Sequence, residues 1–498
     1  MPSLRLRLFA VPALLAAAAT TALAAAPEFE VTYAPSVRSG PISARVYVML
    51  GPAKGLLAKK DPRFGPDWFR PQPFFAVDAK DWKPGEPLRF GADAAGFPGP
   101  LADLEPGEYA AQAVVRLNPD THKLGDGEGN AFGPTTPVHF TVGPEAKEGP
   151  VKLTVDSVVP PRKFPESERV KLVEIDSPLL TAFHKRPIKH RAAVILPEGD
   201  LSSKRATLYI IPGFGGDHFM APQFATNRRL GAGKDLIRVV LDPDCGTGHH
   251  VFADSAFNGP RGKALVKELI PHIEANFPAL AEPRARLVNG HSSGGWSSLW
   301  LQVTYPDTFG GVWSTSPDPV DFRDFSGIDL YAPGVNLFRD GSDARRPIAR
   351  MAKRAVLFVD HFAKMEDVIG DGGQLHSFEA VFSPLGPDRR PRPLWERATG
   401  KVDPETAKAW EKYDIRLTLE RDWERLGPKL KGKIHIVVGE LDTFYLEGAV
   451  KLLKESLQKL GSDAVVEIIP DRDHSTVIDA KLAERFDREM NEAVGKAR

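Results

Sequence analysis

The first part of the chain, from residue 27 to about 149, alternates short apolar runs with glycine and proline turns. Residues 42–48 and 109–115 are rich in β-branched and aromatic side chains and alternate as half-buried strands do. No helical period interrupts them. The pattern predicts a small all-β sandwich over 27–149, and the proline-containing segment 150–165 is predicted to be a linker.

From residue 166 onward, apolar strand-like runs alternate with amphipathic helices. Leu446, Val450, Leu453, Leu457 and Leu460 recur at helical steps of four and three. The alternation predicts an α/β domain over 166–498 with a doubly wound, mostly parallel sheet, whose ligands bind at the carboxyl ends of the strands. The runs that predict strands are 170–175, 192–196, 206–211, 236–241, 286–288, 311–313, 433–438 and 464–469.

The alternation breaks between residues 317 and 430. This segment is too long for a simple connection and carries helical signals of its own at 343–369 and 404–426. We interpret it as a helical insertion that lies over the strand ends, as a lid or a pocket wall.

Residues 1–26 have the pattern of a secretory signal peptide. Arg5 and Arg7 precede an apolar run over 8–19, and Ala22-Leu23-Ala24 supplies a small-x-small cleavage pattern. The alternative, an uncleaved anchor, usually needs about 20 apolar residues, and this run is shorter. The expected location is therefore periplasmic or secreted.

Composition narrows the classes of partner. The 498 residues include 65 basic and 65 acidic side chains, so the formal net charge is zero. General nucleic-acid binders carry a basic excess, so the balance argues against such a partner. Cys245 is the only cysteine, which excludes an internal disulfide and a multi-cysteine zinc site.

The sharpest motif is Gly290-x-Ser292-x-Gly294. It follows the strand predicted to end at 288 and precedes a helix-compatible run over 297–304. A strand–turn–helix setting with flanking glycines is what a nucleophile elbow requires, because the turn exposes the serine oxygen. We therefore predict Ser292 as a nucleophile; the alternative is a structural turn.

A serine hydroxyl needs a base to take its proton and a third group to orient that base. On this type of fold the chain order is serine, acid, histidine. Asp442 and His474 each follow a predicted strand, at the same sheet edge as Ser292. Glu440 competes with Asp442 for the role of the acid, and a surface loop is the alternative for His474.

Ester chemistry also requires donors for the oxyanion. The backbone N–H of Ser293, which follows the nucleophile, is one expected donor. The glycine-rich loop 211–216 is expected to provide the other, and we favour the N–H of Phe214, although its neighbours are also credible. The alternative is a plain glycine-rich loop.

The sequence resembles the putative esterase family of the α/β-hydrolases, also described as the esterase D-like or enterochelin esterase-like family. The resemblance rests on residues 211–216, 268–274 and 290–295, together with Asp442 and His474. It covers roughly 166–495 apart from the insertion, and leaves the β-rich N-terminal part unassigned. It implies an α/β-hydrolase fold and hydrolysis or transfer of carboxylic esters.

Three further groups have two interpretations each. Asp242, Asp244, His249 and His250 suggest either a metal site, which no recognised ligand spacing supports, or a pocket-edge or structural role. Asp318 and Asp321 either line the pocket or cap a helix. The aromatic residues of the N-terminal part form either a sugar-stacking face or a sandwich core; these are Trp68, Phe69, Phe74, Phe75 and Trp82.

The sequence thus predicts a metal-independent and cofactor-independent carboxylic ester hydrolase. Its expected partner is a small-molecule or polymer-attached ester, with no nucleic acid and no stable membrane insertion. The alternatives are an acyltransferase or serine peptidase with the same triad, and a catalytically inactive envelope binding protein.

Overall fold

The computed structural model describes residues 27–140, 149–199, 201–227 and 232–495. The predicted leader, 1–26, lies outside the described residues. In the part of the chain that is described, no helix combines the length and the apolarity needed to cross a bilayer.

The N-terminal part consists of two sheets. One has the order β4-β1-β9, and the other has the order β10-β7-β6-β2-β3-β5, with β8 paired to β6. Val31 of the first sheet and Val48 of the second belong to one buried apolar cluster, which is compatible with the predicted sandwich. The strands are β1 (Phe29–Tyr33), β2 (Ile42–Pro52), β3 (Phe74–Trp82), β4 (Leu88–Phe90), β5 (Ala95–Phe97), β6 (Gly107–Val115), β7 (Ala131–Phe132), β8 (Thr136–Phe140), β9 (Val151–Val155) and β10 (Ser157–Val158).

The segment predicted as a linker, 150–165, is partly built into these sheets. Strand β9 pairs in parallel with β1, and β10 pairs with β7. The reason is the alternation over Val151–Val155, where Leu153 and Val155 are buried and Lys152 and Thr154 are exposed. The connection to the second part is therefore shorter than predicted.

The second part is built on one eight-stranded sheet, in the order β11-β12-β14-β13-β19-β20-β23-β24. All the strand-like runs predicted from residue 170 onward form strands of this sheet. Strands β11, β12 and β14 pair antiparallel and the other pairs are parallel. The bounds are β11 (Val170–Asp176), β12 (Lys189–Ile195), β13 (Thr207–Ile211), β14 (Ile237–Leu241), β19 (Arg286–His291), β20 (Gly311–Thr315), β23 (Ile434–Gly439) and β24 (Val465–Ile469).

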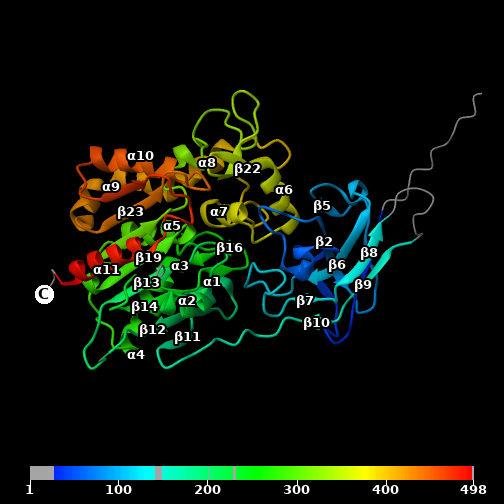
Figure 1. Cartoon of the computed structure of the whole chain (residues 1–498), viewed down its shortest axis with the longest axis horizontal. Helices are drawn as coiled ribbons and strands as arrows, with labels where there is room; N and C mark the ends of the chain where they lie inside the picture. Colours follow the sequence, from blue (N-terminus) through cyan, green and yellow to red (C-terminus); the bar gives the residue numbers. More distant parts are fainter. Residues whose placement is uncertain (1–26, 141–148, 200, 228–231, 496–498) are drawn as a thin grey trace, which may run out of the picture.

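Helices flank this sheet, with α11 among those that pack beside it (Figure 1). Together with the serine turn after β19, the sheet has the architecture of an α/β-hydrolase. The helices of the second part are α1 (Pro178–His184), α2 (Ala221–Thr226), α3 (Arg261–Ala264), α4 (Ile270–Asn276), α5 (Ser293–Thr304), α6 (Val359–Ile369), α7 (Gln374–Phe382), α8 (Pro404–Trp410), α9 (Ile415–Leu430), α10 (Glu447–Lys459) and α11 (Ala480–Gly495).

The predicted insertion, 317–430, contains α6 to α9 and also a β-hairpin. The prediction of a helix over 343–369 is wrong in its first half, because β21 (Pro347–Met351) and β22 (Arg354–Phe358) pair antiparallel there. Ala352 turns the chain with φ 54°. The run around Val356 and Leu357 has β-branched and aromatic character, which favours a strand over a helix.

The N-terminal sheets pack against the insertion. Helix α6 contacts β3 and β5 and lies between the two parts of the molecule (Figure 1). The hydroxyl of Tyr47 donates to the carbonyl of Ile369 over 2.5 Å, and Nε of Arg45 donates to the carbonyl of Val368 over 3.0 Å. These contacts bring the N-terminal part close to the carboxyl edge of the central sheet.

Candidate active site

Ser292 occupies a sharp turn between β19 and α5. Its backbone has φ 60° and ψ −125°, a conformation that L residues adopt only when the surroundings enforce it. A Cβ on Gly290 would lie 2.0 Å from the carbonyl oxygen of Gly294, and one on Gly294 would lie 1.9 Å from that of Ile211. The flanking glycines are therefore required by the close approach of the strand and the helix.

His474 and Asp442 form a buried pair. Nδ1 of His474 lies 2.8 Å from Oδ2 of Asp442, and the Asp442 side chain is fully buried. Oδ1 of Asp442 accepts the N–H of Phe444 over 2.9 Å, which fixes the carboxylate. In this pair the Nδ1–H of His474 donates to the carboxylate, so Nε2 of His474 is left as an acceptor.

The competing acid, Glu440, does not reach the histidine. Its side chain is exposed, and its carboxylate accepts a weak hydrogen bond of 3.5 Å from the N–H of Asp471. The structure therefore brings Asp442, not Glu440, to His474.

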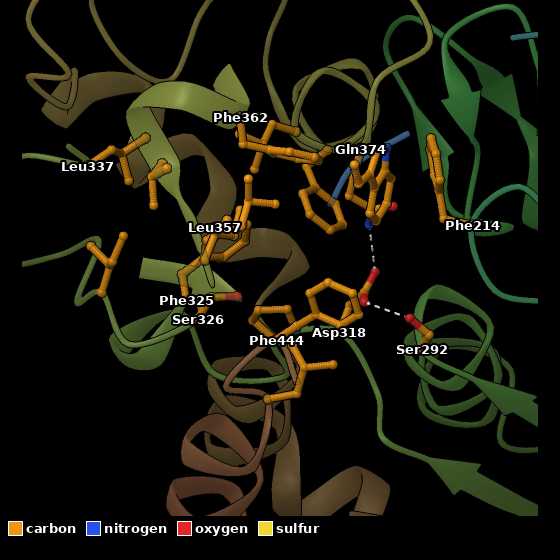
Figure 2. A pocket seen from close by; sticks show the side chains of 18 of the residues that line it. Phe214, Ser292, Asp318, Phe325, Ser326, Leu337, Leu357, Phe362, Gln374 and Phe444 are labelled. Carbon is orange, nitrogen blue, oxygen red and sulfur yellow. Dashed lines mark hydrogen bonds between the residues drawn. The ribbon is translucent and has the colours of Figure 1, made fainter. Parts of the chain in front are cut away.

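Ser292 and His474 line the same cavity. Among the described residues, however, there is no hydrogen bond between them. Oγ of Ser292 instead lies 3.5 Å from Oδ1 of Asp318, as Figure 2 shows. Since a serine side chain changes rotamer without moving the backbone, rotation about its Cα–Cβ bond redirects Oγ within this cavity.

Asp318 is the acidic group nearest to the nucleophile. Its Oδ2 accepts hydrogen bonds from Oγ of Ser293 over 2.6 Å and from Nε2 of Gln374 over 3.2 Å. Burial raises its pKa from 3.8 to about 6, although the hydrogen bond from Ser293 and the charge of His474 favour the ionised form. Asp318 thus lines the pocket, which was one of its two predicted roles.

Asp321 has the other role. Its carboxylate accepts the backbone N–H of Arg323 over 3.1 Å, so it caps the short helical turn that follows it. It also pairs with the guanidinium of Arg416 at 3.4 Å. Gln374, by contrast, carries no sequence signal that connects it with Ser292, because it lies in the insertion.

We expect the Asp318→Asn substitution to change the pH dependence of stability. The raised pKa means that the native state binds this proton more tightly than the unfolded chain does. As the pH rises from about 4 through about 6, the free energy of unfolding of the wild-type protein therefore falls by up to about 3 kcal/mol relative to that of the variant. Urea unfolding of both proteins at several pH values measures this difference, and a difference that does not vary with pH would contradict the assignment.

The two predicted oxyanion donors lie next to the serine. A Cβ on Gly213 would approach Cβ of Ser292 to 3.2 Å, so the 211–216 loop passes close to the nucleophile. In the described part of the chain, neither the N–H of Phe214 nor that of Ser293 donates a hydrogen bond. Two free amides beside a nucleophile are suited to bind a developing negative charge.

His249 holds the loop that carries Phe214. Its Nε2 lies 2.9 Å from the carbonyl oxygen of Pro212, and its Nδ1 accepts the N–H of Val251 over 3.1 Å. Burial lowers the pKa of His249 to about 4, so the neutral ring donates from Nε2 to Pro212. This role corresponds to the pocket-edge or structural interpretation of His249, not to the metal-ligand one.

The other members of the candidate metal group have separate partners. Asp242 lies 3.1 Å from His218, and Asp244 lies 2.5 Å from His122. Over the described ranges, no group of three or more histidine, cysteine, aspartate or glutamate side chains is arranged to hold a metal ion. The structural interpretation of this loop therefore accounts for its contacts.

A cavity of about 310 Å³ opens beside Ser292 and His474. Figure 2 shows Phe214 on the side of the nucleophile and Leu337, Leu357 and Phe362 on the side of the insertion. The insertion therefore forms a wall of the cavity, which is the arrangement expected for a segment that covers the strand ends.

Residues 256–477 match the family described as Putative esterase. The match covers less than half of the chain. The segment contains Ser292, Asp442 and His474, so the three residues that line or support the cavity fall inside the family match. The N-terminal β-rich part lies outside it.

Two curated esterases from Mycobacterium tuberculosis are similar to part of the chain. Esterase MT1326 and Esterase Rv1288 are each 37% identical to it over 138 residues, which is 26% of this chain and 30% of each relative. The chain therefore matches less than a third of the length of these relatives.

Two solved hydrolase structures are similar to about two thirds of the chain. An S-formylglutathione hydrolase from Agrobacterium tumefaciens is 16% identical, and the match covers 66% of this chain and 94% of that chain with a TM-score of 0.39. FphF, a serine hydrolase from Staphylococcus aureus, is 14% identical, with coverage of 66% and 99% and a TM-score of 0.39.

Proposed function

We propose that the protein is a serine-dependent carboxylic ester hydrolase. The observation that carries the proposal is that Ser292 and His474, which is paired with Asp442, line one cavity beside two backbone amides that have no acceptor among the described residues. The match of residues 256–477 to an esterase family supports the same chemistry.

In the proposed reaction, Ser292 turns from Asp318 toward His474. Nε2 of His474 takes the hydroxyl proton as Oγ attacks the ester carbonyl, and Asp442 stabilises the imidazolium that forms. The N–H groups of Phe214 and Ser293 bind the oxyanion. His474 then gives the proton to the leaving alcohol, and a water molecule activated by the same histidine releases the acid from Ser292.

Turnover of p-nitrophenyl butyrate by the purified chain tests the proposal, with the products identified by mass spectrometry. We expect butyrate and p-nitrophenol. Cleavage of peptides at a higher kcat/KM would favour a serine peptidase, and transfer of butyrate to an added alcohol in preference to water would favour an acyltransferase. A folded protein that turns over none of these substrates would indicate an inactive binding protein and would overturn the proposal.

We further propose a secreted or periplasmic location, directed by residues 1–26, and a catalytic domain over 166–498 that follows an all-β sandwich domain. The charged start, the apolar run and the Ala22-Leu23-Ala24 pattern support the leader. Cell fractionation and N-terminal sequencing of the expressed protein test it. We expect a new N-terminus near residue 27 outside the cytoplasm; an intact Met1 in the cytoplasmic fraction would contradict it.

A further inference from the structure

The cavity beside Ser292 is lined almost entirely by apolar side chains beyond the reacting groups. Its acidic and basic lining groups are Asp318, His291 and His474, and among the described residues no lysine or arginine lines it. Burial holds the pKa of His291 well below its usual range, so this ring stays neutral. Most of the wall comes from the insertion, including Phe325, Ile328, Leu337, Leu357, Phe362 and Phe378.

One wall of the cavity does not come from the α/β part at all. Trp68 belongs to the N-terminal β-rich part and lines the cavity. Its ring lies 5.5 Å from that of Phe214 and packs edge-on against that of Phe362 at 5.1 Å and that of Phe444 at 6.2 Å. These partners belong to the oxyanion loop, the insertion and the loop that carries Asp442, so Trp68 joins three parts of the site.

The segment that carries Trp68 is fixed in place. The carboxylate of Asp67 accepts the N–H groups of Phe69 and Arg70, each over 2.9 Å. Lys123 of the N-terminal part also pairs with Asp217 of the α/β part at 2.5 Å. The Asp67 hydrogen bonds therefore order the turn that carries Trp68, and the ion pair joins the N-terminal part to the α/β part.

We propose that the cavity selects esters with a large, uncharged, apolar moiety, and that Trp68 makes the N-terminal part a determinant of this selectivity. The proposal rests on the ester hydrolase function proposed above. An apolar moiety gains free energy when the walls remove it from water, whereas a charged moiety loses its hydration without finding a partner. The carboxyl of Asp318 adds repulsion against an anionic substrate.

The first experiment compares kcat/KM across two substrate series. One series varies the acyl group of p-nitrophenyl esters from acetate to octanoate, and the other varies the alcohol of acetate esters from ethyl to octyl. Each buried methylene contributes about fourfold, so burial of only three methylenes already gives more than about fiftyfold. We therefore expect kcat/KM for octanoate or octyl acetate to exceed that of its shortest homologue by about fiftyfold or more. The series with the increase identifies whether the acyl or the alcohol moiety occupies the cavity.

A matched pair tests the role of charge. The mono-p-nitrophenyl ester of adipic acid has the same chain length as p-nitrophenyl hexanoate but ends in a carboxylate. We expect its kcat/KM to be lower by roughly a hundredfold or more, because a buried unpaired charge is strongly penalised.

The Trp68→Ala substitution tests the contribution of the N-terminal part. We expect kcat/KM for the preferred long substrate to fall about tenfold, mainly through KM, while the value for the shortest homologue changes by less than about threefold. Trp68→Phe keeps an aromatic wall and is expected to restore most of the loss. Phe64→Ala is the control, because Phe64 is an exposed aromatic residue four positions away that does not line the cavity.

The outcomes separate this proposal from the proposed function. Hydrolysis that is equally fast for short, long and anionic esters, or equally fast for Trp68→Ala and wild type on every substrate, would overturn the selectivity proposal and leave the esterase proposal intact. A folded protein that hydrolyses no ester would overturn the proposed function itself. An equal decrease in kcat/KM on all substrates in both Trp68 variants would show that Trp68 contributes to the stability of the site, and would also contradict the selectivity proposal.

Discussion

Replacement of Ser292 with alanine is expected to lower kcat for p-nitrophenyl butyrate by about a millionfold. The substitution removes the oxygen that attacks the ester in the proposed reaction, while the amides of Phe214 and Ser293 remain. The residual rate then reflects binding and oxyanion stabilisation alone. Initial rates of the purified variant, measured against the uncatalysed reaction, give the size of the loss.

Ser342→Ala is the control for this loss, since Ser342 is exposed and its hydroxyl donates to Asp340 within its own turn. We expect this variant to match wild type, and both variants to unfold within a few degrees of the wild-type Tm. A folded Ser292→Ala protein that keeps more than about one per cent of wild-type kcat would show that another group is the nucleophile.

The second large effect is expected for Asp442→Asn. The amide keeps the size of the carboxylate, but its NH₂ group favours the tautomer in which Nδ1 of His474 is the acceptor, so Nε2 carries the proton and no longer acts as a base. A loss of about ten-thousandfold in kcat is expected from the wrong tautomer. Steady-state kinetics on the same ester measures it, with the folded state checked by circular dichroism.

Glu440→Gln is the matched control, because Glu440 lies two residues earlier, competes by sequence for the same role, and is exposed away from His474. We expect its kcat to stay within about twofold of wild type. A larger loss for Glu440→Gln than for Asp442→Asn would reverse the assignment of the acid.

The sheet of the second part was predictable because strands that are buried on both faces consist mostly of consecutive apolar residues. The strands Ile237–Leu241 and Thr207–Ile211 are buried along their whole length and, apart from Arg238 and Thr207, consist of apolar residues; both are central strands as expected. The serine turn was predictable for a related reason: Gly290 and Gly294 stand where any Cβ would collide with backbone.

The elements that the sequence analysis missed have no such distinctive pattern. The hairpin at 347–358 was taken for helix because its apolar spacing fits either period over so short a run. Strand β9 was hidden by the surrounding prolines, and its partner β1 lies about 120 residues earlier in the chain.

The walls of the site were the least predictable part. Trp68 contacts Phe214, which lies roughly 150 residues later in the chain. Gln374 bonds to Asp318, which lies 56 residues earlier. No local sequence pattern encodes contacts over such separations. Asp318 was foreseen only as one of two alternatives, since a buried carboxyl and a helix cap have the same sequence appearance. Position after a strand identifies candidates for chemistry, whereas the shape of the cavity depends on how the insertion and the N-terminal part pack.

The central claim is that Ser292 is an activated nucleophile. Covalent labelling with a fluorophosphonate, followed by peptide mapping, tests this claim most directly. Such a reagent modifies a serine only when a base activates it. The predicted result is a single phosphonyl adduct on Ser292, formed rapidly by wild type and strongly slowed in a folded His474→Ala variant. A folded wild-type protein that stays unlabelled, or an adduct on another residue, would contradict the account.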